Sequence, residues 1–336
     1  MKLQVIGKYL SIILLIFIVS CDTADIDKDA NRNNMDDAIP AIDSHIHLAL
    51  SSPFAKYSEE EAAFYNLSVE EKAEKLQEEM TKAGIQMVFA MGQIGGASDD
   101  PLGINENLKV AALVPGVKVI GAADPMKGMN PGHIAAIKAQ IQKNRNEIIA
   151  LKCYLGYLGG PEDPGYQPYY KLAEEFNLPV IFHTGDTWSA KGDLKLSHPL
   201  GVDRIAWRYP SLRIVLAHVG VPWHQDACEV AWKNDNVWLD ISGVLLGDDE
   251  FINNMLSERK LPDAVPGLVI NDLINALTYM DRYDRVLYAT DWPVISSSML
   301  NYRRFIEVLI PEEHHQKVFW DNAKELFGVG FGEHKE

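Results

Sequence analysis

Short apolar runs alternate with segments of helical period along almost the whole chain. The runs are rich in Val, Ile, Leu and Ala and lack strict alternation with polar residues, which is typical of parallel strands covered on both faces. We expect strands over residues 38–48, 85–91, 117–123, 148–155, 179–183, 213–218, 237–242 and 285–291. Eight strands that are each followed by a helix predict the α/β class, as a (β/α)8 TIM barrel rather than an open doubly wound sheet.

The segments between the strands carry helix signals of their own. Ser68 and Glu71 form a capping-box pattern that opens a helix, and we expect this helix to continue to Ala83 and to end at Gly84. No Gly-x-Gly-x-x-Gly follows the first strand, so a dinucleotide-binding fold lacks its main support. Further helices are expected over 104–113, 131–143, 167–176, 201–208, 225–232, 269–281, 302–308 and 312–327, with longer loops after strands one, five and seven.

The first twenty residues carry signals of export rather than of folding. Lys2 and Lys8 precede an apolar stretch over 10–19. The length of this stretch suits a signal peptide better than a membrane-spanning helix. The stretch ends in Ile-Val-Ser-Cys21, which resembles a bacterial lipobox, where the cysteine is acylated and becomes the mature N-terminus. A cleaved signal with an incidental cysteine is the alternative.

Three regions of the chain follow from these patterns. We expect a lipoprotein signal peptide over 1–20, an acidic disordered tether over 21–37 and a barrel domain over 38–330. The mature protein would then be an exported bacterial lipoprotein, anchored to a membrane through lipid alone. The sequence leaves open which membrane and which face carries the anchor.

The net charge restricts the binding partners of the protein, and the cysteine content restricts its disulfides. The formal net charge is −16, and no basic stripe is present, which argues against nucleic acid as a partner. Beyond Cys21 the chain has only Cys153 and Cys228, which could pair in an exported protein, although nothing in the sequence shows that they are close. Assembly into a homo-oligomer is left open.

Titratable side chains gather at the C-terminal ends of the predicted strands. In the motif Asp-Ser-His-Ile-His, the strand period projects Asp43, His45 and His47 to one side. Such a group is costly to bury unless something binds it, and neutral imidazole is a common zinc ligand. TIM-barrel chemistry lies at this end of the strands, so the pattern predicts a metal-dependent active site. The other strand-end residues are Lys152, His183, His218, Asp240, Ser242 and Asp291.

These motifs together resemble the amidohydrolase-related (amidohydrolase 2) family of the amidohydrolase superfamily. The stretches "DSHIHL", "LPVIFHTG", "IVLAHVG" and "YATDWPV" occur in the order of that family's strand ends, and "DNAKELFG" is similar to its C-terminal helix. The resemblance covers about residues 41–328. It implies a metal-dependent TIM-barrel enzyme that acts on a small molecule.

The resemblance also implies roles for single residues. His45 and His47 match the strand-one metal pair, His183 matches the strand-five ligand, and Asp291 matches the strand-eight ligand and catalytic carboxylate. His218 matches the strand-six histidine, which acts beside the metal as an acid, a base or an electrostatic stabiliser. One divalent ion is implied, with zinc as the expected metal and manganese as the alternative.

Lys152 admits more than one interpretation. It could bind an anionic substrate as an ammonium ion, or it could be carboxylated and bridge a second metal, as the strand-four lysine does in other amidohydrolase branches. A structural lysine is the third interpretation. A second metal is expected only if Lys152 is carboxylated.

The reaction itself stays open between three alternatives. We expect hydrolysis of a small carboxylic ester, lactone or amide by metal-activated water, with Asp291 moving the proton and His218 stabilising the oxyanion. The first alternative is non-oxidative decarboxylation, as in the similar aminocarboxymuconate-semialdehyde and resorcylate decarboxylases. The second is a lipoprotein that binds a ligand without catalysis.

Overall fold

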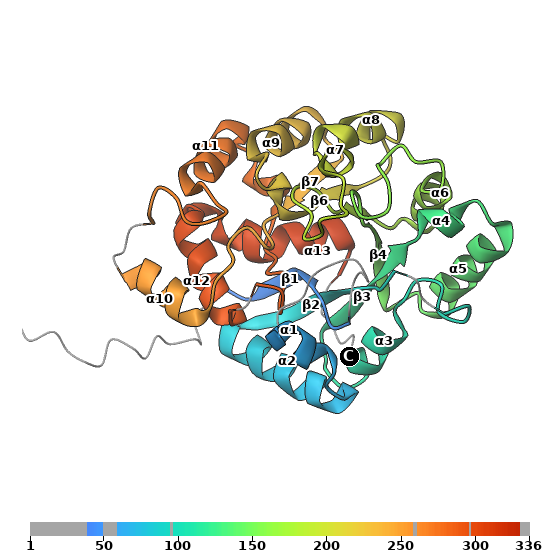
Figure 1. Cartoon of the computed structure of the whole chain (residues 1–336), viewed down its shortest axis with the longest axis horizontal. Coiled ribbons are helices and arrows are strands. Elements are labelled where there is room, and N and C mark those ends of the chain that lie inside the picture. The colour runs from blue at the N-terminus through green and yellow to red at the C-terminus, as the bar shows by residue number, and fades with distance from the viewer. Residues whose placement is uncertain (1–38, 50–58, 95–96, 258–260, 296, 330–336) are drawn as a thin grey trace, which may run out of the picture. The chain divides into compact units, whose positions relative to one another are not determined.

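The computed structural model describes residues 39–49, 59–94, 97–257, 261–295 and 297–329. The predicted signal peptide, Cys21 and the predicted tether lie outside these described residues. Within them, all eight strands form one parallel sheet in sequence order (Figure 1). The strands are β1 (Ala41–Ile46), β2 (Ile85–Met91), β3 (Val117–Ala123), β4 (Ile148–Cys153), β5 (Val180–Phe182), β6 (Ile214–Leu216), β7 (Val237–Asp240) and β8 (Val286–Leu287).

The sheet closes between its first and last strands. Ser44 N–H donates to the carbonyl of Tyr288 at 3.1 Å, and Asp291 N–H donates to the carbonyl of His45 at 2.8 Å. A parallel bridge between Ile46 and Trp292 continues the contact. The predicted TIM barrel is therefore confirmed.

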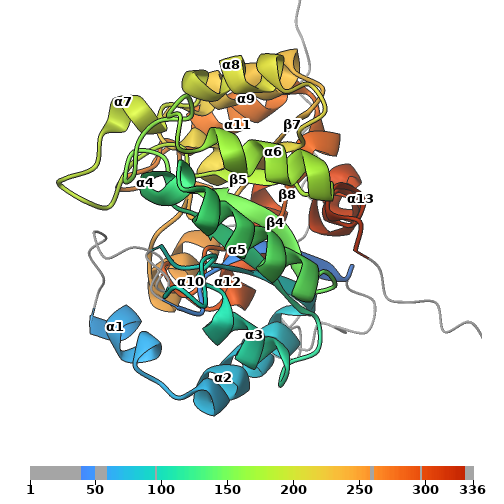
Figure 2. The same cartoon turned by 90° about the vertical axis from the view of Figure 1, so that its right-hand side faces the viewer.

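Helices lie outside the strands in both views (Figures 1 and 2). The capping box of Ser68 and Glu71 opens α2, and Gly84, with φ of 64°, ends it as predicted. The helices are α1 (Glu59–Tyr65), α2 (Val69–Ala83), α3 (Asn105–Ala111), α4 (Pro125–Gly128), α5 (Pro131–Lys143), α6 (Gln167–Phe176), α7 (Leu194–Ser197), α8 (Leu200–Arg208), α9 (His224–Lys233), α10 (Asp249–Ser257), α11 (Ile270–Met280), α12 (Met299–Leu309) and α13 (Asn322–Phe327).

Several predicted boundaries were wrong. The short helices α1, α7 and α10 occupy the loops after strands one, five and seven, where no helix was predicted. The predicted last helix over 312–327 is divided into a 3-10 turn, a π-helical turn at Lys317–Asp321 and α13. Strands six and eight end before their polar residues, at Leu216 and Leu287, and the backbone beyond them leaves the extended conformation, with φ of 63° at His218 and 72° at Asp291.

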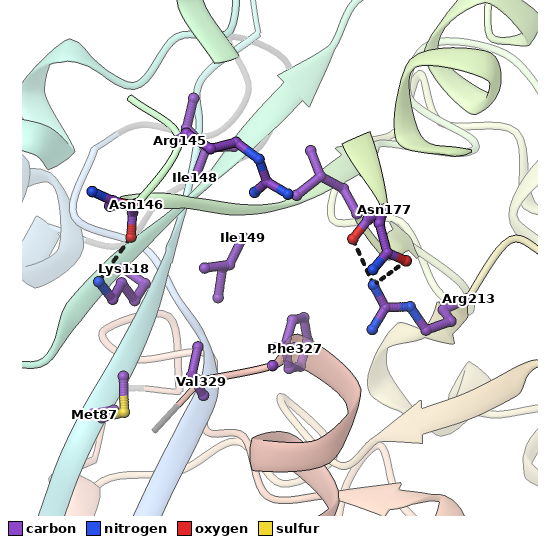
Figure 3. A pocket seen from close by; sticks show the side chains of 12 residues that line it. Met87, Lys118, Arg145, Asn146, Ile148, Ile149, Asn177, Arg213, Phe327 and Val329 are labelled. Carbon is purple, nitrogen blue, oxygen red and sulfur yellow. Dashed lines mark hydrogen bonds between the residues drawn. The ribbon is translucent and has the colours of Figure 1, made fainter. Parts of the chain in front are cut away.

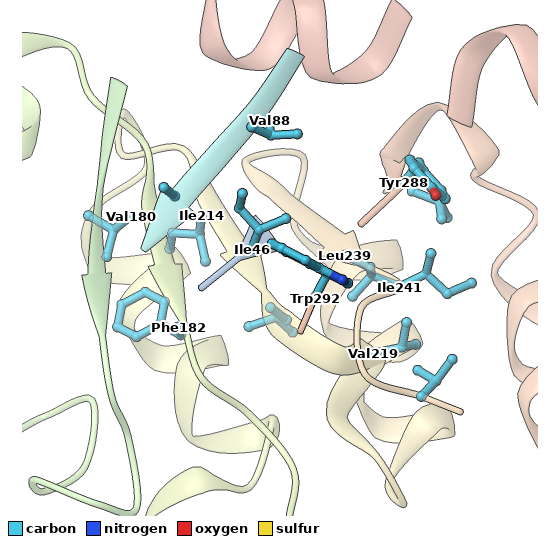
Figure 4. Packing of buried hydrophobic residues seen from close by; sticks show 14 of the residues in the cluster. Ile46, Val88, Val180, Phe182, Ile214, Val219, Leu239, Ile241, Tyr288 and Trp292 are labelled. Atoms are coloured by element: carbon cyan, nitrogen blue, oxygen red, sulfur yellow. The ribbon is translucent and has the colours of Figure 1, made fainter. Parts of the chain in front are cut away.

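The hydrophobic core has an outer and an inner part. The outer cluster packs one side of each strand against the helices, with Val180 and Phe182 of β5 and Ile214 of β6 among its members (Figure 4). The inner cluster contains the alternating residues, such as Ile181 and Val215. Residues of α13, including Phe327, pack against this inner cluster.

Two further observations bear on the sequence predictions. Cys153 and Cys228 are buried and unpaired, so they do not form the disulfide that the sequence left open. In the described part of the chain, no helix combines the length and apolarity needed to cross a membrane.

Candidate metal centre

Strand alternation decides which polar side chains enter the barrel. On β5, Ile181 packs in the inner cluster, whereas Val180 and Phe182 pack in the outer one. His183 lies two residues beyond Ile181 and so continues the inward-facing row. The same rule applies to Lys152 and Asp240, which lie two residues after Ala150 and Trp238. Three strands thus direct polar groups to one space at their C-terminal ends, and Asp291 reaches it from the loop after β8.

His45, His47 and Asp291 lie together at this end of the barrel, and all three are buried. Asp291 Oδ1 is 3.1 Å from His47 Nε2 and 3.4 Å from His45 Nε2. The two Nε2 atoms are 3.3 Å apart. The candidate ligand atoms of the three residues all lie within 4.8 Å of one another, which suits a single divalent ion.

Partners that only accept hydrogen bonds direct the protons on three imidazole rings, and for His45 the Asp240 carboxylate at 3.0 Å from Nδ1 is nearer than Asp291 at 3.4 Å from Nε2. A carboxylate or carbonyl oxygen cannot donate, so the ring nitrogen that faces it must carry the hydrogen. The other nitrogen of each ring then keeps its lone pair. The pairs are His45 Nδ1 with Asp240 Oδ2 at 3.0 Å, His183 Nε2 with the Asp186 carbonyl at 2.9 Å, and His218 Nδ1 with the Ser242 carbonyl at 3.1 Å.

The remaining lone pairs face one another. His183 Nδ1 is 3.2 Å from His218 Nε2, and neither atom carries a hydrogen in this arrangement. His47 Nε2 lies 3.3 Å from His45 Nε2 and 3.1 Å from Asp291 Oδ1, so it can donate to that carboxylate. Facing acceptors repel unless a cation lies between them. The donor set therefore fits a metal ion, and second ring nitrogens held by carbonyls or carboxylates are typical of metal-binding histidines.

The charge states agree with this arrangement. Burial lowers the pKa of His45 to about 3, with the nearby Lys152 adding to the effect. Burial also lowers the pKa of His183 and of His218, which favours the neutral form of both rings. Burial alone would raise the pKa of Asp291, but the neighbouring imidazoles hold it well below its usual range. Neutral imidazoles beside an ionised carboxylate suit a divalent ion.

The expected metal ligands do not all lie equally close to one another in the structure. His45, His47 and Asp291 form one group, whereas His183 lies against His218, with their ring centroids 5.0 Å apart. His218 also lies 5.0 Å from the ring of His45. All five predicted residues therefore share one polar cluster, with His218 between His183 and the strand-one pair.

Lys152 lies at the edge of the same cluster. Its Nζ is 3.5 Å from His45 Nε2, and the side chain is buried. Burial lowers the pKa of Lys152 to about 8. Its position is compatible both with binding an anion and with bridging a second metal after carboxylation.

Two residues that the sequence placed at a strand end, but without a role, contact the cluster directly. Asp240 holds His45, and Ser242 lies within hydrogen-bond distance of both His45 and His218. The sequence could have assigned Asp240 to the cluster, because it lies two residues after Trp238 on β7 and therefore points to the same side of the strand. By contrast, Asp43 accepts from Thr290 and from the backbone of His45, and burial raises its pKa to about 7.

A cavity of about 440 Å³ lies at the opposite, N-terminal ends of the strands (Figure 3). Arg145 and Arg213 line it, and both donate to carbonyls at the C-terminal end of α6, at 2.7 Å and 2.6 Å. Arg213 also donates to the carbonyl of Leu326 in α13. These cations cap helix ends, and the cavity contains none of the predicted site residues.

The chain is similar to known proteins over most of its length. The family model described as amidohydrolase matches residues 42–329. None of the curated proteins matches the chain. A solved structure of an uncharacterised TIM-barrel protein from Bordetella bronchiseptica is 20% identical, with a TM-score of 0.60, and the match covers 86% of this chain and 98% of that one.

Two further solved structures are similar in fold. A probable 2-pyrone-4,6-dicarboxylic acid hydrolase from Acinetobacter baumannii, with citric acid bound, is 16% identical, with a TM-score of 0.57 and coverage of 86% and 99%. A 5-carboxyvanillate decarboxylase from Novosphingobium aromaticivorans, with bound manganese and 3-methoxy-4-hydroxy-5-nitrobenzoic acid, is 14% identical, with a TM-score of 0.60 and coverage of 87% and 98%.

Proposed function

Because the chain belongs to the amidohydrolase family of metal-dependent enzymes, we propose that it is a hydrolase of a small carboxylic ester, lactone or amide. The observation that carries the proposal is the meeting of imidazole lone pairs and an ionised Asp291 at the C-terminal end of the barrel. When bound there, a divalent ion would supply Lewis acidity and lower the pKa of water from about 15.7 towards about 7. We propose zinc as the ion, with manganese as the alternative.

Each residue of the cluster has a part in this proposal. His45, His47, His183 and Asp291 would hold the ion. Asp291 is ionised, so it can also accept a proton from the attacking water and pass it to the leaving group. His218 presents a lone pair on Nε2, which suits it to orient the water that Asp291 deprotonates. In the form of the enzyme whose His218 carries a proton on both ring nitrogens, the imidazolium would instead stabilise the oxyanion that develops on the substrate.

Lys152 supports a second candidate, non-oxidative decarboxylation. A buried ammonium 3.5 Å from His45 Nε2 could bind the carboxylate of an anionic substrate. In this reaction the bond to the carboxylate breaks, carbon dioxide leaves, and a proton adds to the carbon that keeps the electron pair. The 5-carboxyvanillate decarboxylases among the structures of similar fold act on a substrate of this kind.

Isotope labelling separates the two reactions. The protein, reconstituted with zinc or with manganese, is screened against lactones, esters, amides and hydroxybenzoates. Hydrolysis in H2¹⁸O places ¹⁸O in the product carboxylate, whereas decarboxylation in D2O places deuterium on the vacated carbon. Asp291→Asn serves as the control and should abolish either product. A chain that binds metal but turns over nothing would instead favour the non-catalytic binding protein.

Metal stoichiometry tests the role of Lys152. About one equivalent of metal per chain would support a single ion and leave Lys152 free for substrate. Two equivalents that fall to one in Lys152→Met would support a carboxylated, bridging lysine. Mass spectrometry of the native chain would detect the added carbon dioxide.

The N-terminal prediction also remains a proposal. We propose that cleavage before Cys21 leaves an acylated cysteine, an acidic tether over 21–37 and the barrel, so that lipid anchors an exported protein to a membrane. The support is the lipobox pattern in the sequence. Mass spectrometry of the mature N-terminus should show acyl chains on Cys21, and an unmodified residue there would exclude this proposal.

A further inference from the structure

The carboxylate of Asp240 is surrounded by donors. Its Oδ2 faces His45 Nδ1 at 3.0 Å. Its Oδ1 accepts from the backbone N–H of His218 at 3.0 Å, from the backbone N–H of Ser242 at 3.1 Å and from the Ser242 hydroxyl at 2.5 Å. One buried side chain on β7 thus contacts a ring from β1 and the backbone that follows β6.

The hydroxyl of Ser242 extends this network to a second ring. Its single hydrogen is directed to Asp240, so the oxygen is left as an acceptor. That oxygen lies 3.1 Å from His45 Nδ1 and 3.0 Å from His218 Nδ1. Both ring nitrogens therefore face the same acceptor, in addition to the Asp240 carboxylate or the Ser242 carbonyl.

We infer that Asp240 and Ser242 are positioning residues that hold the proton on Nδ1 of both His45 and His218 and thereby present both Nε2 lone pairs to the metal and to water. The inference rests on the proposed metal-dependent function, and it adds that this function requires both rings to carry their proton on Nδ1. Neither residue needs to touch the ion or the substrate. Their effect is exerted through the two rings that they orient.

The chemistry of the amide group makes the inference testable. Asp240 must accept on both oxygens, because all of its partners donate. In Asp240→Asn one of these positions becomes an NH2 group, which would face a donor. If the NH2 group faces His45, the ring is driven to carry its proton on Nε2, where it blocks metal binding. If it faces the backbone of His218 and Ser242, those N–H groups lose their acceptor.

Asp43 offers a matched control. It is also a buried carboxylate that accepts several hydrogen bonds, from the backbone of His45 and from both the backbone and the hydroxyl of Thr290. It contacts none of the imidazole nitrogens in the described structure. Asp43→Asn therefore disturbs a comparable network at the same end of the barrel without changing the acceptor of a ring proton.

The experiment measures two quantities on wild type, Asp240→Asn, Ser242→Ala, Ser242→Thr and Asp43→Asn. The first is the dissociation constant for zinc or manganese, by competition with a chelator. The second is the histidine tautomer in the metal-free chain, from ¹⁵N–¹H correlations of labelled imidazoles. We expect Asp240→Asn to weaken metal binding roughly 10- to 100-fold and to shift His45 to the Nε2–H form. Ser242→Ala should weaken binding less, and Ser242→Thr should restore it.

The inference is overturned by either of two results. One is wild-type metal affinity and unchanged tautomers in Asp240→Asn. The other is an equal loss of affinity in Asp43→Asn, since that would indicate general destabilisation. If Asp240→Asn does not fold, the contrast between Ser242→Ala and Ser242→Thr decides, because the threonine keeps the hydroxyl. A wild-type chain with Nδ1–H tautomers but without turnover would contradict the proposed function and leave the positioning role standing.

Discussion

His183 and His218 present different ring nitrogens to the cluster, because a backbone carbonyl holds the opposite nitrogen of each ring. The Asp186 carbonyl holds Nε2 of His183, so its Nδ1 faces the cluster. His218 is held by Ser242 and presents its lone pair beside His183. Residue identity is therefore insufficient to assign a role, and the partner of each ring is needed as well.

Alanine substitutions should separate these two roles. His183→Ala removes a proposed ligand, so we expect loss of most of the bound metal, measured by plasma mass spectrometry on chelator-free protein. His218→Ala keeps the ligand set, so metal should remain near the wild-type level while turnover falls by about 10²–10⁴, the range of a general acid or base. Full metal content in His183→Ala would contradict its role as a ligand. Unchanged turnover in His218→Ala would show that His218 has a structural role only.

At the scale of elements, α13 lies at the N-terminal end of the barrel, where it contacts β8. Strand β8 is the strand that precedes Asp291. Asn322, at the start of α13, donates from Nδ2 to the carbonyls of Tyr283 at 2.7 Å and of Val286 at 2.8 Å. The motif that resembles the family's C-terminal helix thus has a structural reason: one side chain satisfies two buried carbonyls next to β8. This contact and Asp291 thus lie at opposite ends of β8.

Asn322→Ala should consequently destabilise the fold without touching the metal cluster. It leaves two buried carbonyls without their donor, and we expect the free energy of unfolding to fall by about 2 kcal/mol. The measurement is urea unfolding followed by circular dichroism. Asp321→Ala, at the exposed neighbouring position, should change the free energy by less than about 0.5 kcal/mol. Equal effects of the two substitutions would disprove this account.

At the scale of the whole molecule, the polar cluster brings together residues from the first and the last strands of the barrel. His45 lies on β1 and Asp240 on β7, whereas Asp291 follows β8, and a backbone hydrogen bond from Asp291 to His45 closes the same seam. A bound ion would therefore link strands that are distant in the sequence. Such a ligand favours the folded state over the unfolded one.

Metal removal should lower thermal stability as a consequence. With free metal at 100 times its Kd, binding adds about 2.7 kcal/mol to the free energy of unfolding, which corresponds to a rise in Tm of roughly 4–5 °C for a domain of this size. Differential scanning calorimetry with metal and with chelator measures the shift. His45→Ala should show no metal-dependent shift, and a shift of wild-type size in that variant would place the binding site elsewhere.

The sequence by itself determined the strands, most long helices and the identity of the strand-end residues. These features depend on local chemistry: apolar runs, the capping box at Ser68, and the left-handed C-caps at Gly84 and Gly328. Even the inward direction of His183 follows from the two-residue period of β5. A resemblance in motif order then indicated which of these residues form one site.

Only the tertiary structure decided how the site is built. The tautomers of His45 and His218 depend on Asp240 and Ser242, which are almost 200 residues from His45 in sequence (|i−j| of 195 and 197). The positive φ values at His218 and Asp291 arise where their backbone leaves the strand ladder. Local patterns cannot encode such contacts, because the partner of each ring nitrogen is fixed only when the first and last strands meet.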